Sequence, residues 1–207
     1  MRKYPGFKTV SRLLLAAIAT IWLFTLHPQP AIALPDPAQL AKAVREIEYL
    51  DGMRAGLAST LEDNTEEPTL QTMKEVCKPV GMKAKKLAEE NNWQVKQIAK
   101  KYRNPAHKPE NVQVQMALTK LDLDPELMGF WERTTVNGEP GTHYYRRINV
   151  EASCLACHGA KDDRPQFVKE NYPQDLAYDF EVGDLRGMYS VFIPDEIQQG
   201  VKEAIAN

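Results

Sequence analysis

The feature that most constrains the fold of this chain is a run of five residues, Cys154-Leu155-Ala156-Cys157-His158. A C-x-x-C-H run is the attachment signature of c-type haem. Two intervening residues let both thiols reach one edge of a porphyrin and add across its two vinyl groups, and the adjacent histidine is placed to bind the iron as the proximal ligand. The sequence therefore predicts one covalently attached haem c, held by Cys154 and Cys157 with His158 on the iron.

Three other interpretations of these cysteines stay open at this point. A C-x-x-C pair also occurs in thioredoxin-like redox motifs, but the strand–helix context and the cytosolic setting of that motif are missing. Cys77, Cys154, Cys157 and His158 would make an acceptable Cys₃His ligand set for zinc. A disulfide between Cys154 and Cys157 would close a very short loop and so gain little stability. Haem attachment is the principal hypothesis.

The N-terminal segment has the order of a secretory signal peptide. An apolar run extends from Leu13 to Leu26, and Ala31 and Ala33 form an A-x-A site that predicts cleavage after Ala33. Four basic residues and no acidic ones precede the apolar run: Arg2, Lys3, Lys8 and Arg12. At about 1.5 Å per residue the run spans roughly 21 Å, short of a hydrocarbon core of about 30 Å. A retained N-terminal anchor is the alternative.

Export would favour the haem hypothesis, because haem is attached to these thiols on the outer side of the membrane. The whole chain of 207 residues carries a formal charge of −2, and cleavage would remove four positive charges and no negative one, leaving −6. This balance argues against non-specific nucleic-acid binding, which needs a strongly basic face. With 26% charged residues the chain is too polar for a polytopic membrane protein. The expected locations are the periplasm or the thylakoid lumen.

The first half of the mature chain is predicted to be helical. Apolar residues recur at helical spacing from Ala38 to Leu61, and again from Thr69 to Asn92. Pro79 should kink the second helix or mark a junction between two pieces, because proline cannot donate a helical hydrogen bond. Cys77 lies on the apolar stripe of this helix and should point inward.

The second half alternates short strands and helices, which predicts an α+β domain with one antiparallel sheet. Asn137 to Gly141 separates two strand-like runs and predicts a hairpin whose loop is longer than the tightest turn. The expected elements are a strand over 93–98, a loop over 103–109, a helix over 110–121, strands over 129–136 and 142–150, a helix over 164–171, a strand over 187–193, and a closing helix capped by Asp195 through Ala206.

The sixth position on the iron is not fixed by these patterns. His107 in a proline-rich loop is expected to be solvated, and His143 on a strand is expected at the surface or rim. Position on the helix alone favours Cys77 as an inert, buried residue. The remaining chemically suitable side chains are methionines, which more often belong to a core: Met53, Met73, Met82, Met116, Met128 and Met188.

Two further groups of residues are candidates for the surroundings of the haem. Cations commonly bind haem carboxylates, and the candidates are Arg103, Arg146, Arg147 and Arg186. Large aromatic side chains can pack on a porphyrin or equally in the core, and the candidates are Trp93, Trp131 and Tyr144.

From about Thr69 to Pro194 the chain resembles an exported c-type haem family of cyanobacteria and other bacteria, whose PAS-like haem domain also serves as the sensory part of some membrane-bound signalling proteins. The matching segments are Val76-Cys77-Lys78-Pro79, Trp93, Arg103-Asn104-Pro105-Ala106, Pro109, the run from Cys154 to Gly159, Tyr172-Pro173, Gly183-Asp184-Leu185-Arg186-Gly187 and Tyr189-Ser190-Val191.

This resemblance implies a PAS-like fold: a central antiparallel sheet that holds one haem, flanked by long N-terminal helices. It also implies Cys77 as the distal iron ligand, because the helix cysteine of the family falls at this position. The resulting division is a signal peptide over 1–33, an N-terminal helix over 34–68 and the haem domain over 69–207. The long N-terminal helix could pack against a second copy in a homodimer.

Three functions fit this chemistry. The first is a soluble one-haem electron carrier with an unidentified redox partner protein, working at low potential. The second is a redox or ligand sensor that acts through a separate protein. The third is a haem enzyme such as a peroxidase, which is the least favoured because no distal His/Arg pair is evident in the sequence. We expect a non-enzymatic electron carrier ahead of a sensor.

Overall fold

The computed structural model describes residues 36–62 and 64–195. The predicted signal peptide (1–33) and the predicted closing helix after Asp195 lie outside the described residues. The carboxylate of Asp195 itself accepts hydrogen bonds from Arg133, at 2.7 Å from Nη1. No helix in the described ranges is both long and apolar enough to cross a bilayer.

Two long helical stretches form one layer of the domain. Helix α2 (Pro37–Ala58) begins at Asp36, whose side chain caps the backbone N–H of Ala38, and continues into the short turn η1 (Ser59–Leu61). Helices α3 (Leu70–Val76) and α4 (Lys78–Asn91) follow. Both predicted helices are confirmed, and Pro79 marks the predicted junction at the second residue of α4, where its missing N–H costs little.

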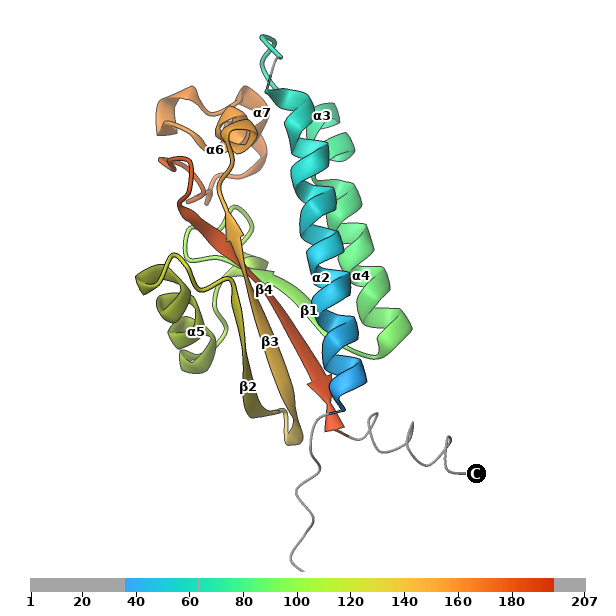
Figure 1. The fold of residues 1–207 in the computed structure, drawn as a ribbon. Helices are drawn as coiled ribbons and strands as arrows, with labels where there is room; N and C mark the ends of the chain where they lie inside the picture. Colours follow the sequence, from blue (N-terminus) through green and yellow to red (C-terminus); the bar gives the residue numbers. More distant parts are fainter. Residues whose placement is uncertain (1–35, 63, 196–207) are drawn as a thin grey trace, which may run out of the picture. The chain divides into compact units, whose positions relative to one another are not determined.

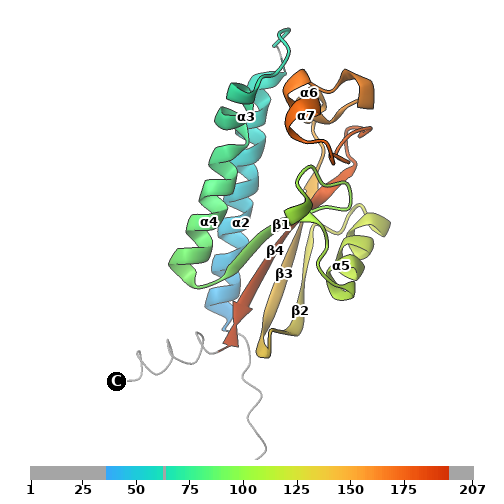
Figure 2. The ribbon, with the colours of Figure 1, turned by 180° about the vertical axis from the view of Figure 1, so that it is seen from behind.

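In the described residues, four strands form one antiparallel sheet in the order β1-β4-β3-β2. They are β1 (Gln94–Ile98), β2 (Gly129–Val136), β3 (Glu139–Asn149) and β4 (Leu185–Pro194). Figures 1 and 2 show α2 and α4 along one face of this sheet and α5 (Val112–Leu123) against the other. The predicted α+β class is thereby confirmed, whereas the PAS-like relationship stays a prediction.

The strand alternation gives each face of the sheet its own core. On one face Tyr189, Val191 and Ile193 of β4 pack with apolar side chains of α2 and α4. On the other face Met188 packs with Tyr145 and the buried side of α5. The helix α2 thus shares a core with the sheet.

The turn between β2 and β3 corrects one prediction. The strands pair as far as Val136 with Glu139, so the loop is the two-residue turn Asn137-Gly138 rather than a longer one. Both residues have positive φ, 53° and 85°, which is the backbone that such a tight turn requires. Pro140 is accommodated in β3 because it lies one residue beyond the last partner in β4, where its missing N–H interrupts no ladder.

None of the three aromatic candidates lines the predicted cofactor site: Trp93 and Tyr144 are buried in the core, and Trp131 lies at the surface. Trp93 belongs to the cluster formed by α2, α4 and the sheet. Trp131 stacks on Tyr144 with ring centroids 4.3 Å apart, in a directly paired position of β2 and β3.

His143 is buried, so the prediction of a surface or rim position is wrong. Its ring stacks on Tyr145 at 4.9 Å between centroids, lies against Phe192, and places Nε2 3.1 Å from Ser190 Oγ. The prediction failed because β3 is a central strand with β4 on one side and β2 on the other, and both faces of the sheet are covered. Burial lowers the pKa of His143 to about 4, against weaker opposing effects of Glu110 and Glu132.

This burial predicts a pH-dependent stability. In the unfolded chain the pKa of a histidine is about 6.5, so below that pH the unfolded state binds a proton that the folded state excludes. The free energy of unfolding should therefore fall as the pH drops from about 6.5 to about 4, by about 3 kcal/mol in total from this residue. Urea unfolding of the protein across this range should show a shallower slope of unfolding free energy against pH in His143→Gln; an unchanged slope would assign the dependence to other groups.

Candidate functional site

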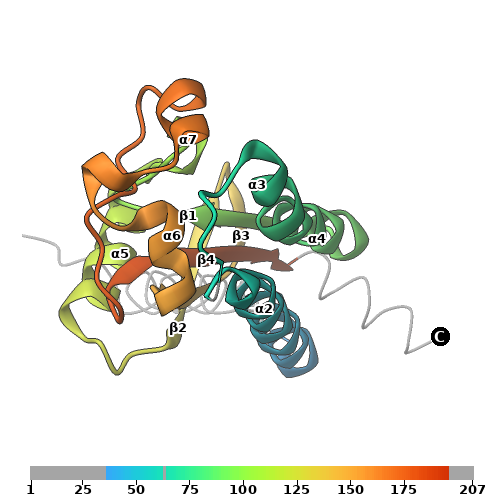
Figure 3. The same ribbon diagram turned by 90° about the horizontal axis from the view of Figure 1, so that it is seen from above.

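The short turns that follow β3 carry the C-x-x-C-H run to one end of the sheet. They are η3 (Ala152–Cys154), α6 (Leu155–His158), η4 (Lys161–Asp163) and α7 (Gln166–Asn171), so the short helix predicted over 164–171 is confirmed within two residues at its start. In Figure 3 α6 and α7 lie together at this end of the domain, with α3 beside them. The turn η3 contacts η1 at the end of α2.

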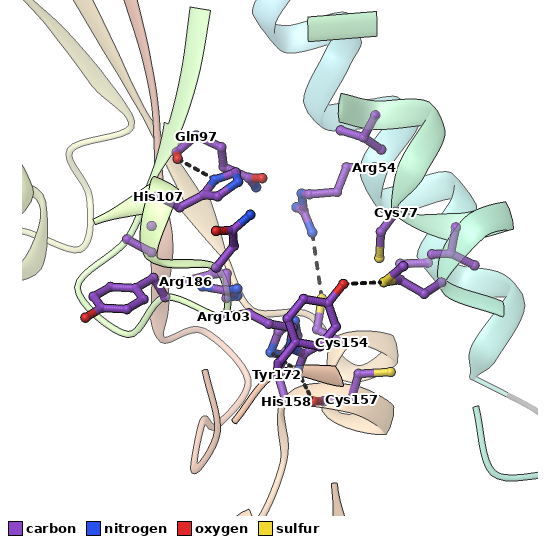
Figure 4. A pocket seen from close by; sticks show the side chains of 18 of the residues that line it. Arg54, Cys77, Gln97, Arg103, His107, Cys154, Cys157, His158, Tyr172 and Arg186 are labelled. Atoms are coloured by element: carbon purple, nitrogen blue, oxygen red, sulfur yellow. Dashed lines mark hydrogen bonds between the residues drawn. The ribbon is translucent and has the colours of Figure 1, made fainter. Parts of the chain in front are cut away.

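A cavity of about 300 Å³ lies at this end of the sheet. Its wall is formed by the α3–α4 junction, the end of β1, the loop that contains η2 (Pro105–His107), the C-x-x-C-H run and the start of β4. Figure 4 shows the labelled side chains around it. The volume lies at the lower end of the range of small-molecule and cofactor sites, about 300–1,000 Å³.

One turn of helix brings the three residues of the motif together. Cys154 ends η3 and α6 continues to His158, so positions 154, 157 and 158 are three and four residues apart and share one helical face. All three line the cavity. Both cysteines are free thiols, and burial raises the pKa of Cys157 to about 11. The structure thus places both sulfurs and the imidazole on one wall.

His158 is oriented by its backbone surroundings. Its Nδ1 lies 2.7 Å from the carbonyl oxygen of Ala177, which assigns the ring proton to Nδ1. Burial holds the pKa of His158 well below its usual value, and the positive charges of Arg186 and Arg103 lower it further. The ring is therefore a neutral imidazole whose Nε2 has a free lone pair, which is the form that binds a metal.

Cys77 approaches the same cavity from the other side. It lies between α3 and α4, and Figure 4 shows its sulfur directed from these helices toward the pocket. Its surface is exposed, yet burial is the largest cause of the raised pKa of its thiol. Both observations follow from its place on the wall of an internal cavity: the side chain is accessible from the pocket but surrounded by protein. Cys77 therefore faces the cavity and is not a buried core residue, and its role as an iron ligand stays a prediction.

Some of the other candidates for the sixth iron ligand line the cavity, and the rest lie away from it. His107 is half-buried and lines the cavity with Nδ1 2.8 Å from the carbonyl oxygen of Gln97, so the expectation of a solvated side chain is wrong. Met73 also lines the cavity, and its Sδ accepts a hydrogen bond of 3.3 Å from Tyr172. His143 and Met188 lie in the other core, and the remaining methionines do not line the cavity: Met53, Met82, Met116 and Met128.

Two of the four arginine candidates reach the cavity. Arg103 and Arg186 line it. Arg146 binds Glu48, with Nε 2.9 Å from Oε1, and Arg147 donates to the carbonyl of Leu121; neither lines the cavity. Burial and the neighbouring Arg103 lower the pKa of Arg186 to about 10.

Sequence reasoning missed Arg54 of α2. Its guanidinium binds Asp51 at 2.7 Å and Glu151 at 3.0 Å, and Nη1 lies 3.7 Å from the sulfur of Cys154. Its position on the helix could have identified Arg54 in the sequence, because it lies four residues from both Leu50 and Ala58, which are buried. A charged residue between two inward positions of a helix indicates a buried ionic contact.

The donor set fits a haem. The described cavity lining contains three arginines and neither aspartate nor glutamate, which suits a ligand with two carboxylates. The Oγ of Ser153 is buried at the same wall with no hydrogen-bond partner in the described part of the chain. Within that part, no three His, Cys, Asp or Glu side chains gather closely enough to hold a metal ion, so the Cys₃His zinc alternative does not fit.

Comparisons with known proteins point to one family. Residues 33–194 match the model of the Tll0287-like family, described as Tll0287. The chain is also similar to a solved structure described as the cyanobacterial heme-protein Tll0287, with 56% sequence identity and a TM-score of 0.70 over 77% of this chain and 97% of that one. No curated protein matches.

Proposed function

The chain belongs to the Tll0287-like family, and from that premise we propose that it is an exported c-type haem protein that transfers electrons at low potential. The observation that carries this proposal is the convergence on one cavity of Cys154, Cys157 and His158 from one side and Cys77 from the other. A haem protein among its relatives, the described Tll0287, supports the choice of cofactor.

The residues of the cavity have separate tasks in this proposal. Cys154 and Cys157 would form the two thioethers, and the Nε2 of His158 would bind the iron. Arg103 and Arg186 bind the carboxylates of the cofactor. When bound, haem supplies a one-electron iron couple. A thiolate from Cys77 bound to the iron together with the imidazole of His158 would donate electron density, favour the ferric state and so lower the potential.

The proposal assigns no catalysis to the site. If Cys77 and His158 both bound the iron, no position would stay open for oxygen or peroxide. The sequence showed no distal His/Arg pair of the kind that a peroxidase needs. In the structure, however, His107 lines the same cavity as Arg103 and Arg186. The case against an enzyme therefore depends on Cys77 occupying the sixth position.

Haem-based sensing is the second candidate function. It is favoured by one observation: the described wall of the cavity carries several side chains besides His158 that can bind iron, among them the sulfur of Cys77, the imidazole of His107 and the thioether of Met73. Exchange among them on reduction would change contacts in the α3–α4 junction or the η2 loop. A separate protein would have to read that change.

The proposal also includes export of the chain and a partner protein. The basic, apolar and A-x-A order of the N-terminus supports delivery to the periplasm or thylakoid lumen. The partner would be a redox protein, the mature chain would be soluble or peripheral to a membrane, and a homodimer through the N-terminal helix is the proposed assembly. Nucleic acid is not a proposed partner.

The test is expression of the full chain with haem-maturation machinery, followed by a mediated redox titration and exposure of the reduced protein to carbon monoxide. We expect haem that survives denaturation on the polypeptide, a reversible one-electron transition at low potential, and no carbon monoxide complex. A carbon monoxide complex of the reduced protein would show that the sixth position opens on reduction and would favour the sensor. A high-spin ferric iron that reacts with peroxide would favour the enzyme, and a protein without haem would overturn the proposal.

A further inference from the structure

Asp175 is a buried carboxylate that lies behind the C-x-x-C-H run without touching its side chains. Its side chain has no exposed surface. Its Oδ1 accepts hydrogen bonds from the backbone N–H of Ala177 at 3.0 Å and from Nε of Arg103 at 3.4 Å, and its Oδ2 accepts from Nη1 of Arg164 at 3.0 Å. A carboxylate with this many fixed partners holds several groups in one arrangement.

Two of these partners lead directly to the motif. Ala177, whose N–H binds Asp175, presents its carbonyl oxygen to Nδ1 of His158 at 2.7 Å. Arg103, whose Nε approaches Asp175, donates from Nη2 to the carbonyl oxygen of Cys157 at 2.7 Å. One carboxylate therefore fixes a partner of the histidine and a partner of the second cysteine.

The backbone around Asp175 is tied to the same place. Leu176 N–H donates to the carbonyl of Tyr102 at 2.9 Å, which joins the segment to the loop that carries Arg103. Asp179 N–H donates to the carbonyl of Gly159 at 2.7 Å, just beyond the end of α6. The segment 175–179 thus runs along the C-terminal end of α6, with Asp175 as its charged anchor.

The positive charges near Asp175 outnumber the negative charge of its carboxylate. Asp175 is paired with two arginines, Arg103 and Arg164, and the third nearby arginine, Arg186, has no carboxylate within ion-pair distance among the described residues. Buried charges interact strongly because the medium around them has a low dielectric constant. The charge of Asp175 therefore acts on any redox centre bound by His158.

We propose that Asp175 is a positioning residue for the iron ligand His158: it holds the Ala177 carbonyl on Nδ1 and offsets the arginine charge beside the site. This inference rests on the proposed haem function. The group that accepts a hydrogen bond from the other ring nitrogen of a ligating histidine fixes the tautomer and orientation of the ring and raises its basicity as a ligand. Loss of the Asp175 charge should weaken this effect and raise the reduction potential.

The test is Asp175→Asn, made in the full chain and matured with haem. We expect a higher potential and an altered low-spin electron paramagnetic resonance spectrum. Asp124→Asn is the matched control, because Oδ1 of Asp124 also accepts from the N–H two residues ahead, Glu126 at 3.1 Å, but it follows α5 and does not line the cavity. A potential and spectrum in Asp175→Asn that equal those of the control would overturn the inference.

A second variant separates this role from a merely structural one. Arg164→Gln removes a positive charge from the same carboxylate and should shift the potential in the opposite direction, downward, while the low-spin spectrum is kept. If Asp175→Asn does not accumulate, an unchanged or raised potential in Arg164→Gln overturns the inference. If the wild-type chain takes up no haem, the proposed function itself is refuted. If the wild type binds haem but the potentials of the variants do not change, only the role of Asp175 is refuted.

Discussion

Serine in place of both Cys154 and Cys157 should abolish covalent haem completely. The two sulfurs are the thioether donors of the proposal, and both lie on the wall of the cavity as free thiols. Serine keeps the size of each side chain but supplies no sulfur, so the pocket should stay folded while the bonds cannot form. After denaturing electrophoresis, haem staining should be present for the wild type and absent for the double variant.

The matched control for this experiment is Cys77→Ser, which removes a sulfur from the same cavity but not from the motif. It should keep its full haem stain. The two single variants, Cys154→Ser and Cys157→Ser, should each retain one thioether and stain more weakly. Haem that remained covalently bound in the double variant would contradict the assignment of these two cysteines.

Substitution of Cys77 by serine should produce the second largest change, in the ligation of the iron. If the Cys77 sulfur occupies the sixth position, the wild type gives a low-spin thiolate signal in electron paramagnetic resonance, and this signal disappears in the variant. The loss of a strongly donating ligand should also raise the reduction potential. Absorption and electron paramagnetic resonance spectra of the ferric protein, with a redox titration, measure all three effects.

The controls for Cys77 are the two other ligands that the structure places on the same wall. Met73→Leu and His107→Gln remove a thioether and an imidazole from the cavity while Cys77 stays in place, and both should keep the thiolate signal. A spectrum that changes in His107→Gln but not in Cys77→Ser would instead assign the sixth position to His107, and would reopen the enzymatic alternative.

Local patterns predicted the elements of this domain well because each depends on neighbouring residues. Helical spacing located α2, and the proline at 79 located the α3–α4 junction. The hairpin was found but its loop was predicted too long: Glu139 pairs with Val136, and Pro140 lies one residue beyond the last residue of β3 that pairs with β4.

The candidate site could be predicted only in part, because local patterns depend on neighbouring residues and the site joins distant ones. The run from Cys154 to His158 occupies one helical turn, so five consecutive residues were enough to predict its chemistry. The environments of His107 and His143 were both predicted wrongly, because exposure depends on which segments cover a strand or loop. Of the four arginines considered, only two line the cavity, and nothing in their local sequence separates them.

The sequence by itself determined the C-x-x-C-H motif, the order of helices and strands, and the α+β class, because all three follow from spacing along the chain. Only the tertiary structure decided which distant residues meet at the motif. Arg54 approaches Cys154 across 100 positions, and Asp175 meets Arg103 across 72. Such contacts form when α2 and the loops after β1 and α7 pack around one end of the sheet, and packing between segments leaves no periodic trace in either of them.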